Sequence, residues 1–409
     1  MATFFWGAST SAHQVEGGNN NDWTEWEHAN AKLKVKSAKL KVWPDFILKS
    51  YPNPLLPENY ISGRACDHYK RFREDFDIAK QLRHNAHRFS IEWSRVEPEE
   101  GKFNQKEIEH YRQVVEALRE RGLEPFVTLW HWTLPIWLSN LGGLENKNFP
   151  YYFARYARRL AEVLKDDVTF WITLNEPTAF IRNSLMVGVF PPHKKSSVAA
   201  TRALWRAAQA HRRAYATIHS LWPDARVGFS AAVRYIEPAT RSPLDAASTF
   251  AAKFWSYNLF LLLTGSANDY IALQYYRRAK IGFPMHILEE KNGAISDIGW
   301  EIYPEGLYRL LKIFAKYNKP IYITENGIAD TRDTKRGWFI ADHIFWMRKA
   351  MKDGADVRGY FHWSLLDNFE WDKGFWPRFG LVEVDYRTMK RKIRPSAFIY
   401  KKIIETDRV

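Results

Sequence analysis

The chain has 409 residues, a formal net charge of +14 and 46% apolar residues. This composition supports a large buried core and excludes a chain that is disordered along its length. The positive charge alone would permit a nucleic-acid partner. However, Lys and Arg are interleaved with Glu and Asp, as in residues 106–121, and no nucleic-acid recognition motif is present. We therefore expect no nucleic acid among the partners.

The single cysteine, Cys66, excludes an intrachain disulfide and a metal site built from several cysteines. The first residues, 1–7, lack the basic segment and the long apolar segment of a signal peptide. The apolar run at residues 257–263 is too short to span a bilayer. These features predict a cytoplasmic protein without a membrane partner, and nothing in the sequence defines its oligomeric state.

Short strand-like runs alternate with amphipathic helical segments along the whole chain. The predicted strands are residues 4–8, 86–91, 125–130, 170–174, 226–231, 270–275, 320–324 and 358–363. The predicted helices between them include residues 106–120, 151–164, 198–221, 305–317 and 338–351. Eight such repeats predict an α/β fold of the (β/α)8, or TIM barrel, type. Because no linker-like or low-complexity stretch interrupts them, residues 1–409 are expected to form a single domain.

A doubly wound parallel sheet would give a similar alternation. Such a sheet normally carries a glycine-rich phosphate turn after its first strand, and this chain has neither a GxGxxG nor a Walker-type sequence. The barrel is therefore the preferred interpretation. One dense basic run, residues 32–41, is interpreted as a charged surface loop, with binding of an anionic partner as the less favoured alternative.

In a parallel barrel the active site lies where the carboxyl ends of the strands open on one face. Polar and aromatic residues gather at these predicted ends. They are Arg88, Glu92, His131, Asn175, Glu176, Gln274, Tyr276, Glu325, Asn326 and Trp363. They come from six strands, so the predicted fold brings them together in one bowl.

Two of these residues, Glu176 and Glu325, are carboxylates that directly follow predicted buried strands. Charged side chains are rarely buried without a partner. Two carboxylates at one barrel mouth therefore suggest a pair that divides acid and nucleophile roles. Taken singly, Glu176 could instead be a helix-start residue before Pro177, and Glu325 a turn acid before Asn326 and Gly327.

Several motifs together resemble family 1 of the glycoside hydrolases, the β-glucosidase and β-galactosidase family of retaining (β/α)8 enzymes. They are FWGASTSAHQVEG at residues 5–17, RFSIEWSR at 88–95, VTLWHW at 127–132, NEP at 175–177, TENG at 324–327 and WSLLDNFEW at 363–371. Their order and spacing extend the resemblance over nearly the whole chain.

The resemblance implies a role for each residue that matches a catalytic position. Glu325 would be the nucleophile and Glu176 the general acid and then the base, with the charge of Glu325 keeping Glu176 protonated. Arg88 would favour the ionised form of Glu325, and Tyr276 would donate a hydrogen bond to it. Protonation and attack would both be carried by side chains, so we expect neither a metal nor an organic cofactor.

The resemblance also implies the substrate-binding residues. The sugar hydroxyls would be bound by Gln14, His131, Asn175, Glu370 and Trp371, above Trp363 as a stacking surface, with Trp132 and Phe379 as walls and Trp300 as the platform for the leaving group. The implied substrate is a β-glucoside, with β-galactosides or β-fucosides as further substrates of an exo-acting enzyme. Because the carboxylate of Glu370 would repel a phosphate, the substrate is expected to be unphosphorylated.

Two departures from the family pattern bear on this expectation. Gln274 stands where the family usually has Asn, and its longer side chain could reposition the hydrogen bonds around Glu325. The stretch of residues 235–269 is shorter than usual, so loops on the leaving-group side could leave a more open entrance. Two alternatives remain at this stage: a transglycosylase on the same scaffold, and a catalytically weak sugar-binding barrel.

Overall fold

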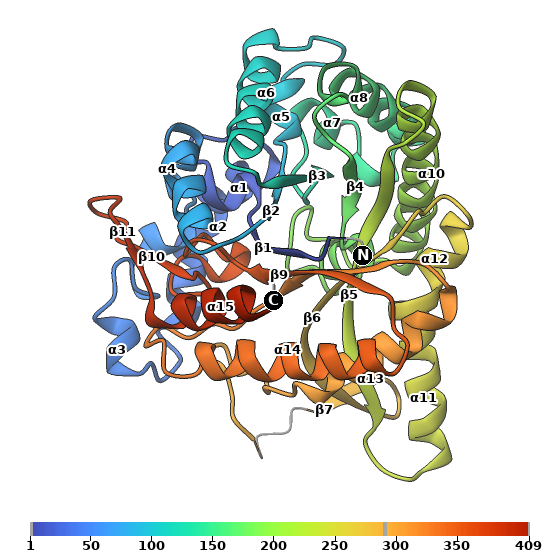
Figure 1. Ribbon diagram of the computed structural model, residues 1–409. Helices are drawn as coiled ribbons and strands as arrows, with labels where there is room; N and C mark the ends of the chain where they lie inside the picture. The colour runs from blue at the N-terminus through green and yellow to red at the C-terminus, as the bar shows by residue number, and fades with distance from the viewer. Residues whose placement is uncertain (1–2, 289–292, 408–409) are drawn as a thin grey trace.

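The computed structural model describes residues 3–288 and 293–407, and within them eight parallel strands form a closed barrel surrounded by helices (Figure 1). In order around the barrel, the strands are β1 (Phe5–Ser9), β2 (Ala86–Ser90), β3 (Glu124–Trp130), β4 (Phe170–Asn175), β5 (Arg226–Pro238), β6 (Ile271–Gly282), β8 (Ile321–Asn326) and β9 (Val357–Trp363). Pairing of β9 with β1 and of β5 with β6 closes the ring. The predicted (β/α)8 barrel is confirmed.

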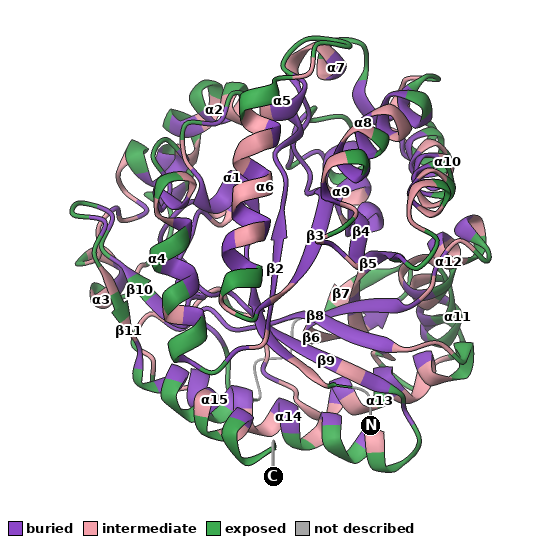
Figure 2. Ribbon diagram, turned by 45° about the horizontal axis from the view of Figure 1, so that its top comes forward, coloured by how far each residue is buried: buried purple, intermediate pink, exposed green. Residues whose placement is uncertain are grey.

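Helices lie outside the ring, with their buried sides toward the strands and their exposed sides toward solvent (Figure 2). They are α1 (Ala12–Val15), α2 (Asp22–Ala38), α3 (Asp45–Leu48), α4 (His68–Gln81), α5 (Trp93–Val96), α6 (Gln105–Glu120), α7 (Ile136–Asn140), α8 (Phe149–Leu164), α9 (Pro177–Ile181), α10 (Ser197–Leu221), α11 (Pro243–Lys253), α12 (Leu259–Thr264), α13 (Glu305–Phe314), α14 (Arg336–Lys352) and α15 (Pro395–Thr406). Within residues 3–288 and 293–407, none of them has both the length and the apolar character needed to cross a bilayer.

Local sequence explains where the outer helices begin and which side they bury. Helix α6 starts after Asn104, whose side chain accepts a hydrogen bond from the backbone N–H of Lys106 at 3.1 Å. Its apolar residues, including Ile108, Tyr111 and Val115, recur at helical spacing and are buried. The long outer helices such as α8 and α10 bury an apolar side in the same way, and the space between these helices and the strands forms the larger core of the molecule.

Aromatic rings fill the interior of the barrel below the carboxyl ends of its strands. The rings of Phe126 and Phe170 stack with centroids 4.2 Å apart, and Phe5, Tyr322 and Phe361 pack around them. This packed layer closes the barrel to solvent, so ligands can enter only from the other end.

Three segments differ from the sequence-based expectation. Strands β5 and β6 continue past the barrel, where they keep pairing from Tyr235 to Pro238, and β6 then turns back through β7 (His286–Leu288). The basic run was expected to be a surface loop, but residues 32–38 belong to helix α2, because Ala31, Val35 and Ala38 are buried at helical spacing. The expected loops within residues 235–269 are largely helical, forming α11 and α12. A small hairpin of β10 (Val382–Val384) and β11 (Arg391–Ile393) completes the fold.

Candidate active site

A cavity of about 290 Å³ opens at the carboxyl ends of the barrel strands. Every predicted site residue except Arg88 and Phe379 lines it. The residues in question are Gln14, His131, Trp132, Asn175, Glu176, Tyr276, Trp300, Glu325, Trp363, Glu370 and Trp371. Two other strand-end residues do not: Glu92 accepts hydrogen bonds from Thr133, and Asn326 donates one to the carbonyl of Tyr275 at 2.6 Å. Both residues therefore make contacts within the protein and do not face the cavity.

Register shifts in the strands turn the two carboxylates toward the cavity. Leu174 and Ile323 both belong to the outer core, so strict alternation would direct Glu176 and Glu325 outward as well. The pairing of β4 with β5 shifts between Ile172 and Asn175, and that of β8 with β9 shifts between Ile323 and Asn326. Such irregularities re-aim side chains next to active sites.

Glu325 is held by three donors. Arg88 donates from Nη1 to Oε1, Gln274 donates from Nε2 to the same oxygen at 2.7 Å, and the hydroxyl of Tyr276 donates to Oε2 at 2.6 Å. Arg88 is completely buried behind the cavity wall. Burial raises the pKa of Glu325, and the guanidinium of Arg88 and the hydroxyl of Tyr276 oppose that rise.

Glu176 has a different environment. Its backbone lies in the left-handed region with φ of 44°, and its side chain does not cap helix α9, which begins at Pro177. It is not, therefore, a conventional helix-start residue. Burial, followed by the charge of Glu325, raises the pKa of Glu176 well above its usual range. Arg88 and Arg234 oppose this rise, but among the described residues neither forms an ion pair with Glu176, whereas Arg88 is bonded to Glu325. This difference favours the proton on Glu176.

Asn175 connects Glu325 to His131 on the cavity wall. Its Oδ1 accepts hydrogen bonds from Arg88 at 2.6 Å, Ser230 at 2.7 Å and Gln274 at 2.8 Å. Three donors on one oxygen fix the amide orientation, so Nδ2 donates to Nε2 of His131 at 3.0 Å. The amide of Gln274 therefore bridges Asn175 and Glu325.

Three buried polar atoms that belong to cavity-lining residues have no hydrogen-bond partner in the described part of the chain. They are Nδ1 of His131, Oε1 of Gln274 and Oε2 of Glu370. Burial and Arg88 lower the pKa of His131 well below its usual range, so its ring is neutral. Burial raises the pKa of Glu370 to about 8. Unsatisfied donors and acceptors of this kind match a ligand with several hydroxyl groups.

Aromatic rings form the rest of the wall. Trp132 and Trp371 lie with ring centroids 4.7 Å apart, and the ring of Trp363 lies nearly parallel to that of His131 at 6.1 Å. Trp132 and Trp371 both have positive φ, at 80° and 50°, a strained conformation for large side chains that is typical of functional sites. Phe379 lies behind the wall and packs against Trp363 rather than lining the cavity.

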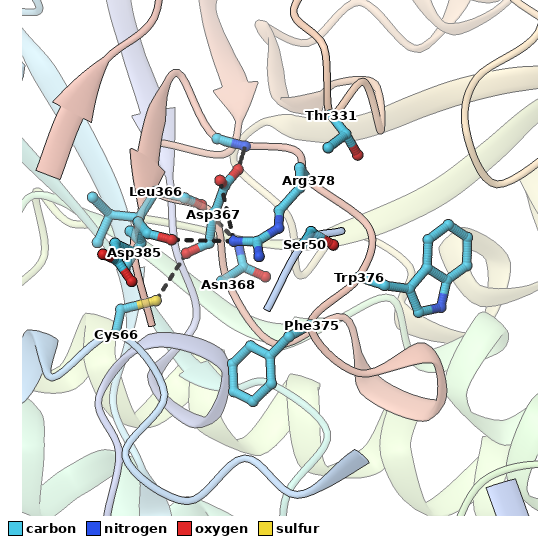
Figure 3. Close-up of polar contacts among 12 residues, drawn as sticks. Ser50, Cys66, Thr331, Leu366, Asp367, Asn368, Phe375, Trp376, Arg378 and Asp385 are labelled. Carbon is cyan, nitrogen blue, oxygen red and sulfur yellow. Dashed lines mark hydrogen bonds and ion pairs between the residues drawn. The ribbon is translucent and has the colours of Figure 1, made fainter. Parts of the chain in front are cut away.

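A buried ion cluster anchors the loop between Trp363 and Trp371 that supplies Glu370. Asp367 accepts hydrogen bonds from Arg394 at 2.8 and 2.9 Å, and Arg378 lies 3.5 Å away. The thiol of Cys66 donates to the backbone carbonyl of Asp367 at 2.8 Å, and Figure 3 shows Cys66 and Arg378 converging on this residue. The cluster fixes the backbone that presents Glu370.

Sequence reasoning missed several lining residues, notably Arg182, Arg234, Arg277 and Lys373. Arg234 and Arg277 lie on the unpredicted extensions of β5 and β6, and Arg182 begins the π-helical turn Arg182–Val187 after α9. A signal was available for Arg234 and Arg277, which follow the predicted strand ends at residues 231 and 275 within three residues.

Comparison with known proteins identifies the kind of enzyme to which this barrel and cavity belong. The family model for "Glycosyl hydrolase family 1" matches residues 1–285 and 251–409. Beta-glucosidase A of Thermotoga maritima is 34% identical over an alignment of 450 positions, which covers 99% of this chain and 97% of the relative. A beta-galactosidase of Sulfolobus acidocaldarius is 31% identical, with 99% and 94% covered.

Solved structures agree. A beta-glycosidase from Pyrococcus horikoshii superimposes with a TM-score of 0.87 at 34% identity, covering 98% of this chain and 93% of that one. The Thermotoga maritima beta-glucosidase in complex with glucoimidazole gives 0.85 at 31% identity, with 99% and 98% covered. The fold and site thus define an O-glycosyl hydrolase of the β-glucosidase type. The chain belongs to glycosyl hydrolase family 1, as its motifs predicted.

Proposed function

We propose that the protein is a retaining exo-β-glycosidase that hydrolyses unphosphorylated β-glucosides, and also β-galactosides or β-fucosides, with residues 1–409 acting as one catalytic unit. The observation that carries the proposal is the asymmetry of the two carboxylates. Glu325 accepts hydrogen bonds from Arg88, Gln274 and Tyr276, whereas Glu176 is buried and keeps the proton.

In the first step, Oε2 or Oε1 of Glu325 attacks the anomeric carbon, and Glu176 donates its proton to the leaving oxygen as the glycosidic bond breaks. This forms a covalent glycosyl ester on Glu325 and releases the alcohol. In the second step, Glu176, now ionised, takes a proton from water as the water oxygen attacks the anomeric carbon. The ester bond to Glu325 breaks, the sugar leaves with its β configuration, and Glu176 is protonated again.

Supporting residues have roles that follow from their contacts. Arg88 and Tyr276 keep Glu325 ionised and oriented before attack. The free atoms of His131, Gln274 and Glu370, together with Gln14 and Asn175, are suited to bind sugar hydroxyls. Trp363 and Trp371 supply apolar surface for the ring, and Trp300 lines the cavity toward the leaving group.

Glu370 supports the choice of an unphosphorylated sugar. It lines the cavity and brings no positive charge to bind a phosphate, and its ionised form, which predominates above its pKa of about 8, would repel a phosphate dianion. Both chemical steps use side-chain carboxyls alone, so the proposed mechanism requires neither a metal nor an organic cofactor. Exhaustive dialysis against EDTA should leave the rate unchanged.

Replacement of the nucleophile tests the proposal. Glu325→Ala cannot form the glycosyl ester, so turnover of β-glucosides should be lost. Azide can enter the vacated space and attack directly, and the variant should then convert an activated aryl β-glucoside into the α-glucosyl azide. Wild-type rates in the variant, or a β-configured azide product, would contradict the assignment of Glu325.

A further inference from the structure

A group of three arginines, which we call the arginine cluster, lines the cavity beside Glu176. Arg182 follows α9, Arg234 lies on the extension of β5, and Arg277 lies on the extension of β6. The three therefore come from consecutive strands of the barrel, β4 to β6. Burial and the neighbouring charges of Arg277 and Arg182 together lower the pKa of Arg234 to about 9, with the carboxyl of Glu176 opposing them. The three cations are thus close enough to repel one another.

Among the described residues, the nearby carboxylates are bound elsewhere and form no ion pair with Arg182 or Arg234. Glu237, on the same strand as Arg234, is 3.3 Å from Arg278, and Asp372 is 3.0 Å from Lys373. Glu325 is bound to Arg88, and Glu176 holds a proton in the resting enzyme. Among the described residues, Arg234 forms no ion pair with a carboxylate, and the only hydrogen bond of the Arg182 side chain is a 3.5 Å contact with Asn183.

This arrangement contrasts with that of Arg394 and Arg391, whose side chains are buried. Arg394 binds both oxygens of Asp367, and Arg391 binds both oxygens of Asp75. Arg182 and Arg234 are only partly buried and line the cavity, so a ligand in the cavity can reach them. A planar guanidinium also matches a carboxylate or phosphate through two parallel hydrogen bonds. The cluster therefore suits a ligand that brings an oxyanion with it.

The cluster lies on the side of the leaving group. The acid must donate its proton to the leaving oxygen, so the aglycone contacts the wall next to Glu176. Arg234 belongs to this wall, because the backbone N–H of Glu176 donates a hydrogen bond of 2.9 Å to the carbonyl of Ser230, four residues before Arg234 on β5, and all three arginines line the same cavity as Glu176. The same wall carries apolar side chains, including Ile236, Trp255 and Met285, and Arg277 lies over the ring of Trp300 at 4.9 Å.

We propose that the leaving-group end of the cavity binds an apolar, aromatic aglycone that carries a carboxylate or another oxyanion, which Arg234 and Arg182 bind. This inference rests on the proposed function and specifies its substrate class. The enzyme should then favour a negative charge on the aglycone. It should disfavour a negative charge on the sugar beside Glu370.

Matched pairs of glucosides test the inference. The first pair is the β-glucoside of 3-hydroxybenzoate and that of 3-hydroxybenzamide, in which the meta position keeps the charge out of conjugation with the leaving oxygen. The second pair is the β-glucoside of 3-hydroxybenzyl phosphate and that of 3-hydroxybenzyl alcohol. At neutral pH we expect the ratio of kcat/KM, anionic over neutral, to be about tenfold or more in at least one pair, as one charge-assisted hydrogen bond would give. The pair with the larger ratio identifies the oxyanion.

Variants connect the preference to the cluster. Arg234→Gln and Arg182→Gln should each reduce the ratio severalfold, chiefly through KM of the anionic substrate, whereas Arg234→Lys should retain part of it. Arg212→Gln, on an exposed part of α10, removes one positive charge elsewhere and should leave the ratio unchanged. Added NaCl should lower the wild-type ratio by screening.

The possible failures are distinguishable. If the wild-type enzyme hydrolyses the neutral glucosides but shows a ratio of one or less in both pairs, the inference is wrong and the proposed function stands. If Arg234→Gln slows both members of a pair equally and only shifts the pH profile, Arg234 acts through Glu176 and the inference is wrong. If none of the four glucosides is hydrolysed, the proposed function itself is contradicted.

Discussion

Gln274 donates a hydrogen bond of 2.7 Å to Oε1 of Glu325, the same oxygen that accepts from Arg88. The other contact of this amide nitrogen, at 2.8 Å, is with Asn175. The side chain thus connects Glu325, the proposed nucleophile, to Asn175, which donates a hydrogen bond to His131. Its remaining oxygen has no partner among the described residues and belongs to the cavity wall.

The first prediction concerns Gln274→Asn. The shorter side chain cannot reach both acceptors from the same backbone, so Glu325 loses a hydrogen bond to its charged form. Such a bond contributes about 1.5–3 kcal/mol, which corresponds to a fall in kcat/KM of roughly 10- to 150-fold. The acidic limb of the pH profile should also move upward, because the ionised form of Glu325 is less stabilised. An unchanged rate and profile would show that Gln274 is dispensable.

The second prediction concerns the anchor of the Glu370 loop. Asp367→Ala leaves Arg394 without its buried partner, and breaking such a pair costs about 3–5 kcal/mol of unfolding free energy. The matched control is Asp356→Ala, which removes an exposed pair with Arg358 and should cost less than about 1 kcal/mol. Chemical denaturation of both variants at neutral pH measures the difference.

The same pair gives a pH dependence with a defined sign. Burial alone would raise the pKa of Asp367, but Arg394 and Arg378 outweigh burial and lower this pKa below its usual value. A carboxyl with a lowered folded-state pKa contributes stability above its unfolded-state pKa, and this contribution is lost as pH falls through the folded-state pKa. The gap in stability between wild type and Asp367→Ala should therefore narrow in acid. A gap that is constant from neutral pH to about pH 3 would exclude the ion pair as its source.

The third prediction concerns Glu370→Ala. The variant loses carboxyl contacts to sugar hydroxyls, each worth about 1–3 kcal/mol, so kcat/KM for a neutral aryl β-glucoside should fall by roughly a hundredfold. Discrimination against the 6-phosphorylated glucoside should narrow above about pH 8, where the repelling carboxylate of Glu370 is the major form in the wild type. Glu383→Ala, which changes an exposed carboxylate on β10, is the control and should alter neither quantity. Undiminished discrimination in Glu370→Ala would place the phosphate-excluding group elsewhere.

The sequence alone predicted the eight barrel strands, because each is an apolar run between amphipathic helices. It also predicted that Glu176 and Glu325 lie at strand ends. It could not predict that these side chains turn inward, since Leu174 and Ile323 two residues earlier face the outer core and only a register shift reverses the alternation. The contact of Cys66 with Asp367 was also inaccessible, because it joins residues 301 positions apart.

The lengths of β5 and β6 show a second limit. Their predicted ends, at residues 231 and 275, fall shortly before the polar residues Arg234, Arg277 and Arg278, where the apolar runs stop. In the structure the two strands support each other beyond the barrel, with Tyr235 opposite Arg278 and Ile236 opposite Ala279. Tertiary pairing, rather than local preference, extends them and brings Arg234 and Arg277 to the cavity.

The last prediction concerns Glu176→Gln and separates substrates by their leaving groups. An amide cannot donate a titrating proton, and general acid catalysis is worth about 10²–10⁴-fold. Alkyl β-glucosides and cellobiose should therefore lose activity on that scale. Nitrophenolate departs without protonation, so the first step on a nitrophenyl glucoside should suffer far less, and the glycosyl intermediate should accumulate as a burst.

The pH profile of the same variant provides an independent readout. The active wild-type form has Glu325 ionised and Glu176 protonated, so the rate rises as Glu325 loses its proton and falls as Glu176 does. Since burial and Glu325 raise the pKa of Glu176, the alkaline limb belongs to Glu176. The variant should lose that limb and keep the acidic one. Equal slowing of both substrate classes with both limbs retained would make Glu176 a structural residue, and another acid would have to protonate the leaving group.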